Sequence, residues 1–112
     1  MSKFAEAVVN YKTQVSNLGL DISDDLLTKV AKGLGPSIYN ADSSKVSGSD
    51  KSELDRVKTN YLMKKLGLAD SPELDSAIAE VMEKMGSSNR NKHRAVVYAL
   101  LAKKFGKESI YS

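Results

Sequence analysis

The sequence predicts an all-α fold, a compact single-domain bundle of about five helices. Apolar residues recur every three or four positions through most of the chain, which is the spacing of the buried face of an α-helix. Serine or aspartate precedes most of these stretches and glycine follows them, as is typical of helix starts and ends. No stretch alternates apolar and polar residues for long enough to predict a β-strand. We therefore expect one helical domain over residues 1–112.

Two helices are expected in the first third of the chain, over residues 2–18 and 24–34. Ser2 is the candidate N-cap of the first helix, and a glycine directly after its last apolar residue ends it. Ser23 offers a capping hydroxyl to the second helix, and the two aspartates that follow suit the positive end of the helix dipole. A Gly-Pro pair then ends the second helix.

Three further helices are expected over residues 51–66, 72–85 and 90–105. Asp50 and Glu53 have the spacing of a capping box, in which each side chain accepts a hydrogen bond from the backbone of the other residue. Apolar residues cover about half the circumference of the helix that follows, so we expect this helix to be the central one.

All five helices are expected to pack around apolar residues of the last three, whereas residues 36–49 are rich in serine and turn formers. We interpret residues 36–49 as a long connection with one short turn around Ile38 and Tyr39. The predicted core residues are Leu54, Val57, Tyr61, Ile78, Val81, Val97 and Leu101.

The composition argues against several classes of function. Because the chain has no cysteine, it can form no disulfide, thiolate zinc site or cysteine nucleophile, which suits a reducing cytoplasm. No apolar run approaches the roughly 20 residues of a membrane-spanning helix, and the N-terminus lacks the apolar core of a signal peptide. Asp21, Asp24 and Asp25 do not have the spacing of a calcium loop. We expect a cytoplasmic protein with no metal, no cofactor and no membrane contact.

Three stretches end alike: LTKVAKGLG at 27–35, YLMKKLG at 61–67 and ALLAKKFG at 99–106. Lysines in a last turn stabilise the negative end of a helix, and glycine adopts the left-handed conformation that ends it. Lys103 and Lys104 are therefore explained without a ligand.

The charge of the chain is uneven. Residues 84–107 hold seven cations and no acid, so the other 88 residues sum to −4 in a chain of net charge +3. Arg90, Lys92, His93 and Arg94 crowd the predicted start of the last helix, where the dipole disfavours each positive charge by about 0.3–1 kcal/mol. Because a helix N-terminus with added cations can bind phosphate, these four residues form a candidate anion-binding site.

The structural alternative is that these cations pair with acids elsewhere in the fold. Arg94 lies on the predicted core-facing side of its helix, so we expect it to have an internal partner. His93 is the only histidine, and no serine and aspartate have a spacing that supports a catalytic triad, so we expect no enzyme activity. The candidate partners of Arg94 are Asp21, Asp24, Asp25, Asp50, Asp55, Asp70 and Asp75.

Four further stretches are distinctive: the helix start SDKSELDRV, the helix end KKLGL, the segment AIAEV, and the K-x-R opening before YALLAKKFGK. Together they cover about the last two-thirds of the chain, and they resemble a small bacterial domain of unknown function, family 2853. The resemblance implies a short bacterial helical protein with no established activity, cofactor or active site. It carries over no site residues.

Two functions follow as hypotheses. The leading one is a non-enzymatic binding or interaction domain whose partner is another protein or a second copy of the chain. The alternative is binding of nucleic acid or an anionic ligand through the basic start of the last helix. A net charge of +3 is small beside typical DNA-binding domains, and no helix-turn-helix pattern is evident, so nucleic acid is not favoured.

Overall fold

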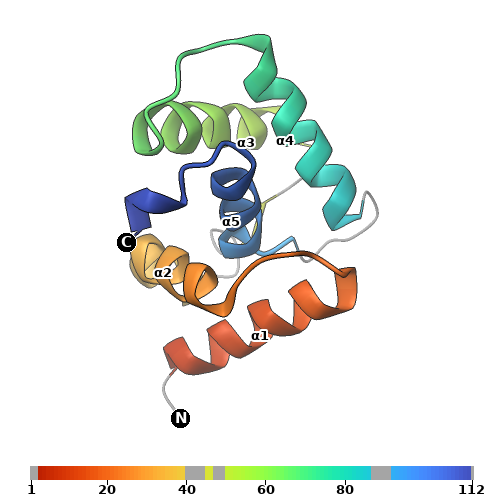
Figure 1. Ribbon diagram of the computed structural model, residues 1–112, viewed down its shortest axis with the longest axis vertical. Coiled ribbons are helices and arrows are strands. Elements are labelled where there is room, and N and C mark those ends of the chain that lie inside the picture. The colour runs from red at the N-terminus through yellow and green to blue at the C-terminus, as the bar shows by residue number, and fades with distance from the viewer. Residues whose placement is uncertain (1–2, 40–44, 47–49, 87–91, 112) are drawn as a thin grey trace.

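The structure is a computed structural model that describes residues 3–39, 45–46, 50–86 and 92–111. Within these ranges it is all-α, as predicted (Figure 1). Its five α-helices are α1 (Lys3–Leu18), α2 (Asp24–Leu34), α3 (Lys51–Arg56), α4 (Pro72–Met85) and α5 (Arg94–Lys104). Three other helical segments are the 3-10 helix η1 (Gly35–Tyr39), the π-helix η2 (Val57–Lys65) and the 3-10 helix η3 (Glu108–Tyr111).

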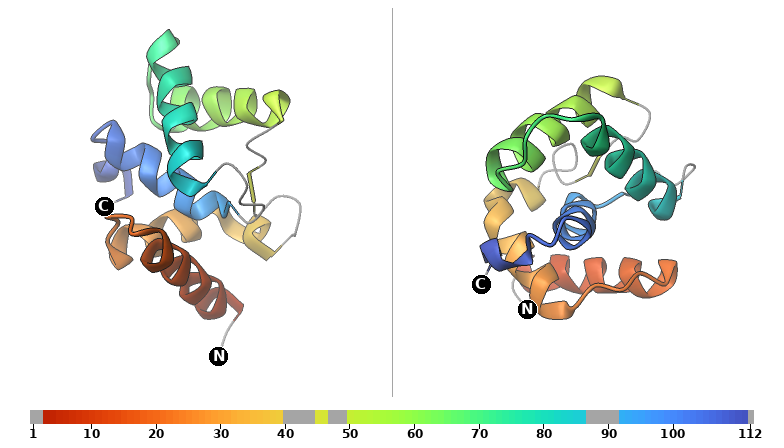
Figure 2. Two further views of the ribbon diagram at one scale, coloured as in Figure 1. Left: turned by 90° about the vertical axis from the view of Figure 1, so that its right-hand side faces the viewer. Right: turned by 45° about the horizontal axis from the view of Figure 1, so that its top comes forward.

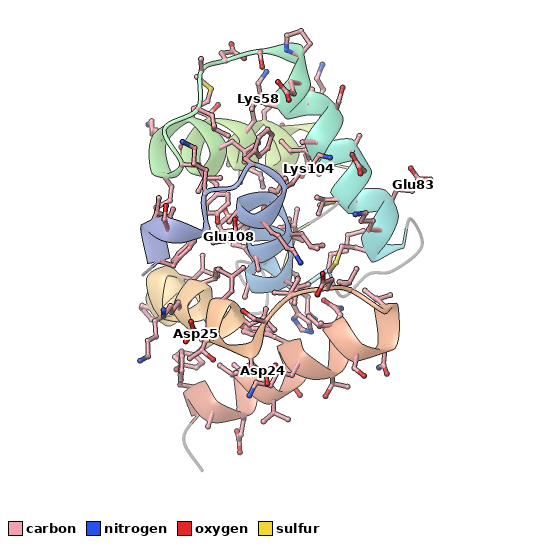
Figure 3. The ribbon with its side chains drawn as sticks, viewed as in Figure 1. Asp24, Asp25, Lys58, Glu83, Lys104 and Glu108 are labelled. Carbon is pink, nitrogen blue, oxygen red and sulfur yellow. The ribbon has the colours of Figure 1, made fainter. Side chains whose placement is uncertain are left out.

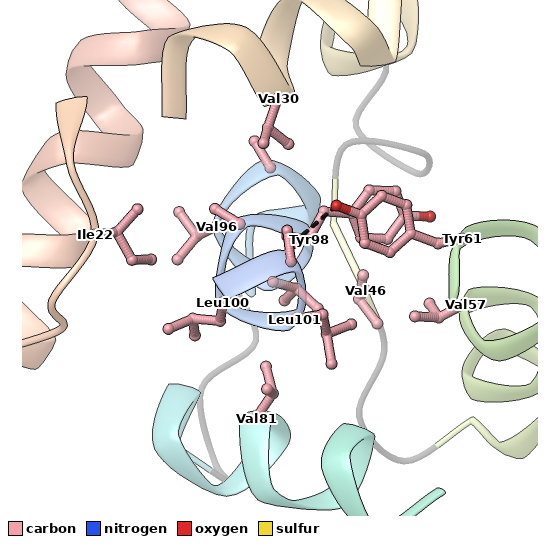
Figure 4. Close-up of a cluster of buried hydrophobic side chains, with 14 of the residues drawn as sticks. Ile22, Val30, Val46, Val57, Tyr61, Val81, Val96, Tyr98, Leu100 and Leu101 are labelled. Carbon is pink, nitrogen blue, oxygen red and sulfur yellow. Dashed lines mark hydrogen bonds between the residues drawn. The ribbon is translucent and has the colours of Figure 1, made fainter. Parts of the chain in front are cut away.

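The centre of the fold is α5, not the third helix that the sequence predicted. All eight residues from Ala95 to Ala102 are buried, so α5 is apolar on every side, as a helix enclosed by others must be. Figure 2 (right) shows α5 nearly end-on between α1 on one side and α3, η2 and α4 on the other. Side chains from α2, α4 and η2 reach α5 from different directions (Figure 4).

The predicted caps at Ser23 and Asp50 are confirmed. The Ser23 hydroxyl accepts a hydrogen bond from the backbone N–H of Leu26 at 3.1 Å, and the Asp50 carboxylate accepts bonds from two N–H groups at the start of α3. Ser71 is the N-cap of α4 as expected, although its side chain makes no capping bond. The candidate cap Ser2 lies outside the described residues.

The third predicted helix is α-helical only in its first part, because η2 continues it with wider turns. The N–H of Leu66 donates to the carbonyl of Tyr61, five residues earlier, at 2.9 Å. In an α-helix each residue advances by about 100°, which would place the buried residues Val57 and Leu66 on opposite sides. The π-helix advances by about 80° per residue and brings Val57, Tyr61, Leu62 and Leu66 to one face. Burial of these four side chains on one face explains the wider turn.

The long connection contributes to the core, which the sequence did not predict. The N–H of Val46 donates to the carbonyl of Lys92 at 2.8 Å, Lys45 and His93 form an isolated antiparallel bridge, and Val46 is buried. Because residues 92–93 are extended in this pairing, α5 begins at Arg94 and not at the predicted residue 90. The predicted short turn after α2 is confirmed as η1.

Candidate functional site

The four cations of the predicted anion site lie where the chain enters α5, but the described ones are not a free cationic surface. Arg90 lies outside the described residues. Lys92 precedes the helix and is only 4% exposed. His93 is the N-cap and Arg94 the first residue of α5, and both are partly buried. The structure therefore brings together three of the four predicted residues and turns them largely inward.

Arg94 joins three segments of the chain. Its guanidinium group donates hydrogen bonds to the Glu53 carboxylate, to the Lys45 carbonyl at 3.3 Å and to the Tyr98 hydroxyl at 2.9 Å. The Arg94 and Glu53 side chains are 14% and 13% exposed. Burial opposes the charge, but the Tyr98 hydroxyl and the Glu53 carboxylate outweigh this effect and raise the pKa of Arg94.

The expected internal partner of Arg94 is thus present, but it is Glu53, which was not among the predicted acids. The sequence assigned Glu53 to the capping box, whereas its carboxylate contacts Arg94 and lies 3.4 Å from Arg56. Arg94 is therefore a structural cross-link between segments of the fold. Anion binding by the cations at residues 90–94 stays a prediction.

His93 connects α5 to α1. Its backbone N–H donates to the Gln14 side-chain carbonyl at 3.3 Å, and its ring meets the Tyr11 ring edge-on, with 5.2 Å between the ring centres. Burial, and then the positive charge of Lys45, lower the pKa of His93 below its usual value. The only histidine is therefore a packed residue.

A tyrosine cluster lies between η2, α5 and the C-terminal segment. The rings of Tyr61 and Tyr98 stack with centres 3.8 Å apart (Figure 4). The Tyr61 hydroxyl donates to the Tyr98 carbonyl at 3.0 Å and lies 2.7 Å from the Tyr111 hydroxyl. Burial raises the pKa of both Tyr61 and Tyr111, so these phenols stay protonated. The cluster is a structural contact that no sequence pattern indicated.

A groove opens where the connection between α1 and α2 meets α4 and the end of α5. It has a volume of about 560 Å³, within the range of ligand pockets. We call it the α4–α5 groove. Its floor is apolar, made of Leu18, Leu20, Val81 and Leu100, and its rim is charged, made of Asp21, Glu80, Lys84, Lys103 and Lys104, with Gly19 completing the lining.

Both acids on the rim are already paired with lysines of α5. The Lys103 ammonium lies 2.8 Å from the Asp21 carboxylate, and the Lys104 ammonium lies 2.6 Å from that of Glu80 (Figure 3 labels Lys104). These contacts lower the pKa of Asp21 and of Glu80. Within the part of the chain that the structure describes, Lys84 makes no ion pair. The rim therefore presents one unpaired cation beside two paired ones.

The sequence did not predict this groove. Lys103 and Lys104 were explained as residues of a helix end, and they do lie in the last turn of α5. Their partners come from the connection after α1 and from α4, so only the fold brings these charges together. A second, more polar hollow of about 500 Å³ lies between α2 and η3 and shares Asp21 and Lys103 with the α4–α5 groove.

The chain matches the model of a family described as "Protein of unknown function (DUF2853)" over residues 10–109. The chain belongs to the DUF2853 family. The resemblance found from the sequence is thereby confirmed, and the match extends into the first third of the chain. A comparison with curated proteins found no match.

Two further properties of this DUF2853 chain bear on its site. In the described ranges, no three His, Cys, Asp or Glu side chains are grouped so that they could hold a metal ion. None of the helices described here combines the length and the apolar character that crossing a membrane requires. The candidate sites on this chain are the basic start of α5, the α4–α5 groove and the hollow between α2 and η3.

Proposed function

We propose that this DUF2853 protein is a non-enzymatic binding domain and that the α4–α5 groove is its binding surface. The observation that carries the proposal is the combination of an apolar floor with a charged rim in one groove. Binding surfaces commonly have this composition, because apolar contact supplies affinity and charged groups at the edge supply orientation.

The environments of the polar residues support a non-enzymatic role. A general acid or base needs a pKa near the working pH and access to a substrate. His93 packs on Tyr11 with a lowered pKa, and burial raises the pKa of Tyr61. Neither residue lines the groove. For the same protein we propose a cytoplasmic location, which the lack of cysteine supports, and a bacterial origin, which the resemblance to family 2853 implies.

Nucleic-acid or anionic-ligand binding through Arg90, Lys92, His93 and Arg94 is the second candidate. The surplus of cations in residues 84–107 favours it. The burial of Lys92 and the contacts of Arg94 count against it, because phosphate contacts require cations that can reach the ligand. We therefore place the binding surface in the groove and not at the start of α5.

Site-specific photo-crosslinking in cells of the source organism tests the groove. A photoreactive residue at Lys84 reports from the rim, and one at Lys51, which is also exposed but does not line the groove, is the control. We expect a discrete crosslinked product from position 84 and none from position 51. The proposal fails if both positions give the same products or if position 84 gives none.

A further inference from the structure

We infer that the occupant of the α4–α5 groove is an acidic amphipathic segment of another protein, with apolar side chains on the floor and carboxylates at the lysine rim. This inference rests on the proposed function, since it names the partner of the same groove.

The floor is suited to apolar anchors. Val81 and Leu100 are buried at its base, while Leu18 and Leu20 are half-buried on either side of Gly19. Gly19 has φ of 66°, which turns the chain sharply between the two leucines. A Cβ atom placed on Gly19 would meet no other atom within 4 Å, so the groove is open above this turn. An apolar side chain of a partner can therefore reach the floor.

The rim is suited to carboxylates. Lys84 makes no ion pair among the described residues, although its charge also helps to lower the pKa of Glu80, so its ammonium can donate hydrogen bonds to a partner's carboxylate. Lys103 and Lys104 are paired with side chains that are 100% and 49% exposed, those of Asp21 and Glu80. Because exposed ion pairs contribute little to stability, a partner's carboxylates can replace these acids at small cost.

The charge near the groove selects against a basic partner. The rim holds three lysines and two acids, so its net charge is +1, and Lys84 is the lysine that makes no ion pair among the described residues. Such a surface repels basic segments and attracts acidic ones. Because bringing like charges together costs free energy, the positive rim disfavours basic partners as well as favouring acidic ones.

The floor separates an acidic peptide from a nucleic acid. Both are polyanions, but binding of single-stranded nucleic acid relies on aromatic side chains on which bases stack. The described residues that line the groove include no aromatic side chain, and the floor is aliphatic. An amphipathic helix that places residues i, i+3, i+4 and i+7 in an apolar groove uses both features. The groove therefore favours a peptide over a polynucleotide.

Titration of the isotopically labelled chain with three synthetic helical peptides tests this inference by NMR. The first peptide carries leucine on one face and glutamate elsewhere, the second has lysine in place of glutamate, and the third has serine in place of leucine. We expect the first peptide to shift the amide signals of Leu20, Val81, Lys84 and Lys103. The second and third should bind at least about tenfold more weakly, which corresponds to about 1.4 kcal/mol.

Two charge reversals provide matched variants. Lys84→Glu should weaken binding of the acidic peptide by about tenfold, because it replaces an attraction by a repulsion at the rim. Lys51→Glu makes the same change of charge on an exposed residue away from the groove, so it should leave binding unchanged. Thermal melting of both variants verifies that they fold.

Several outcomes would overturn the inference. One is equal binding of the acidic and basic peptides, and another is a shift map that lies outside the groove. A third is a single-stranded oligonucleotide that shifts the groove signals more strongly than the peptide, and a fourth is concentration-dependent self-association through them. If position 84 gives crosslinks but the acidic peptide is not preferred, the inference of an acidic partner is wrong, whereas the proposal that the groove is the binding surface is still supported.

Discussion

The Arg94 guanidinium group contacts the carboxylate of Glu53, which lies 41 positions earlier in the chain. The same guanidinium donates to the carbonyl of Lys45, so one side chain ties α3 and the long connection to the start of α5. Partly buried charges are stabilising only when paired, since each loses solvation on folding. The contact therefore stabilises the junction of three segments that are far apart in the sequence.

Arg94→Ala should lower the free energy of unfolding by about 2–4 kcal/mol. Removing one partner of a buried pair typically costs about 3–5 kcal/mol, because the other charge stays buried. Here Arg56 remains 3.4 Å from Glu53, which reduces the loss. Arg94→Lys should recover only part of it, because an ammonium group cannot match the planar guanidinium at three acceptors. Urea denaturation measures these changes.

A double-mutant cycle with Glu53→Gln is the control. If Arg94 and Glu53 act through each other, the double variant should lose less stability than the two single variants together, with a coupling of about 1–3 kcal/mol. Strictly additive losses would show that the contact contributes nothing. A loss under about 0.5 kcal/mol for Arg94→Ala would restore Arg94 as a residue available to a ligand.

His93 should make the chain less stable as the pH falls from about 7.5 to 5.5. Its pKa is lowered in the folded state by burial and by Lys45, while in the unfolded state it titrates near 6.5. The unfolded state therefore binds a proton first, and stability decreases through this window until the pH is below the lowered pKa. The slope is at most about 1.4 kcal/mol per pH unit, because one proton is involved.

His93→Gln should flatten this pH dependence. Denaturation of both proteins at the two ends of the window provides the comparison, since most carboxylates stay ionised there. If the parent were instead more stable at pH 5.5 relative to the variant, His93 would be gaining charge in the fold, and the packing against Tyr11 would be the wrong description.

Tyr61→Phe should cost about 1–2 kcal/mol, and Tyr111→Phe less than about 1. The Tyr61 hydroxyl is buried and donates to the Tyr98 carbonyl, and it also meets the Tyr111 hydroxyl. Tyr111→Phe leaves the bond to Tyr98 in place. Tyr39 is half-exposed, so Tyr39→Phe is the matched control and should be silent. Equal effects of all three changes in denaturant melts would contradict the buried hydrogen bond.

The helices were predictable where local chemistry determines them. Ser23 and Asp50 cap α2 and α3 through bonds within four residues, and such bonds can be inferred from spacing alone. The π-helix was not predictable, because its wider turns depend on the burial of both Val57 and Leu66 by other segments of the fold. The sequence also did not predict that α5 is the central helix, because its ends are charged and only its middle is apolar on every side.

The candidate site, like the fold, was predictable only in part. The position of Arg94 on its helix was enough to predict that it faces inward. Its partner Glu53 could not be predicted, because a carboxylate three residues after Asp50 is equally well explained as part of a cap. The α4–α5 groove combines the end of α1, one face of α4 and the last turns of α5. No spacing within the sequence indicates that these three surfaces meet.

Gly33→Ala should stabilise the chain by about 0.5–1 kcal/mol. Gly33 lies inside α2, where glycine is less favourable than alanine by about that amount. A Cβ atom at this position would lie 3.6 Å from the Tyr111 ring, an ordinary packing distance, so no clash offsets the gain. A decrease in melting temperature would mean that Tyr111 packs closer to α2 than this distance.

Leu101→Ala and Lys103→Ala test the packing of α5 as a pair. Leu101 is fully buried at the centre of the fold, so its truncation should cost about 2–5 kcal/mol through lost burial and a cavity that other side chains fill only in part. Lys103 lies two residues further along the same helix, and its ion pair with the fully exposed Asp21 should contribute little, so Lys103→Ala should cost far less than Leu101→Ala. Urea denaturation of the two variants should therefore give midpoints that differ widely, although both changes shorten a side chain to alanine. Equal small losses would mean that α5 does not present Leu101 to the core, and the arrangement of helices around it would have to be different.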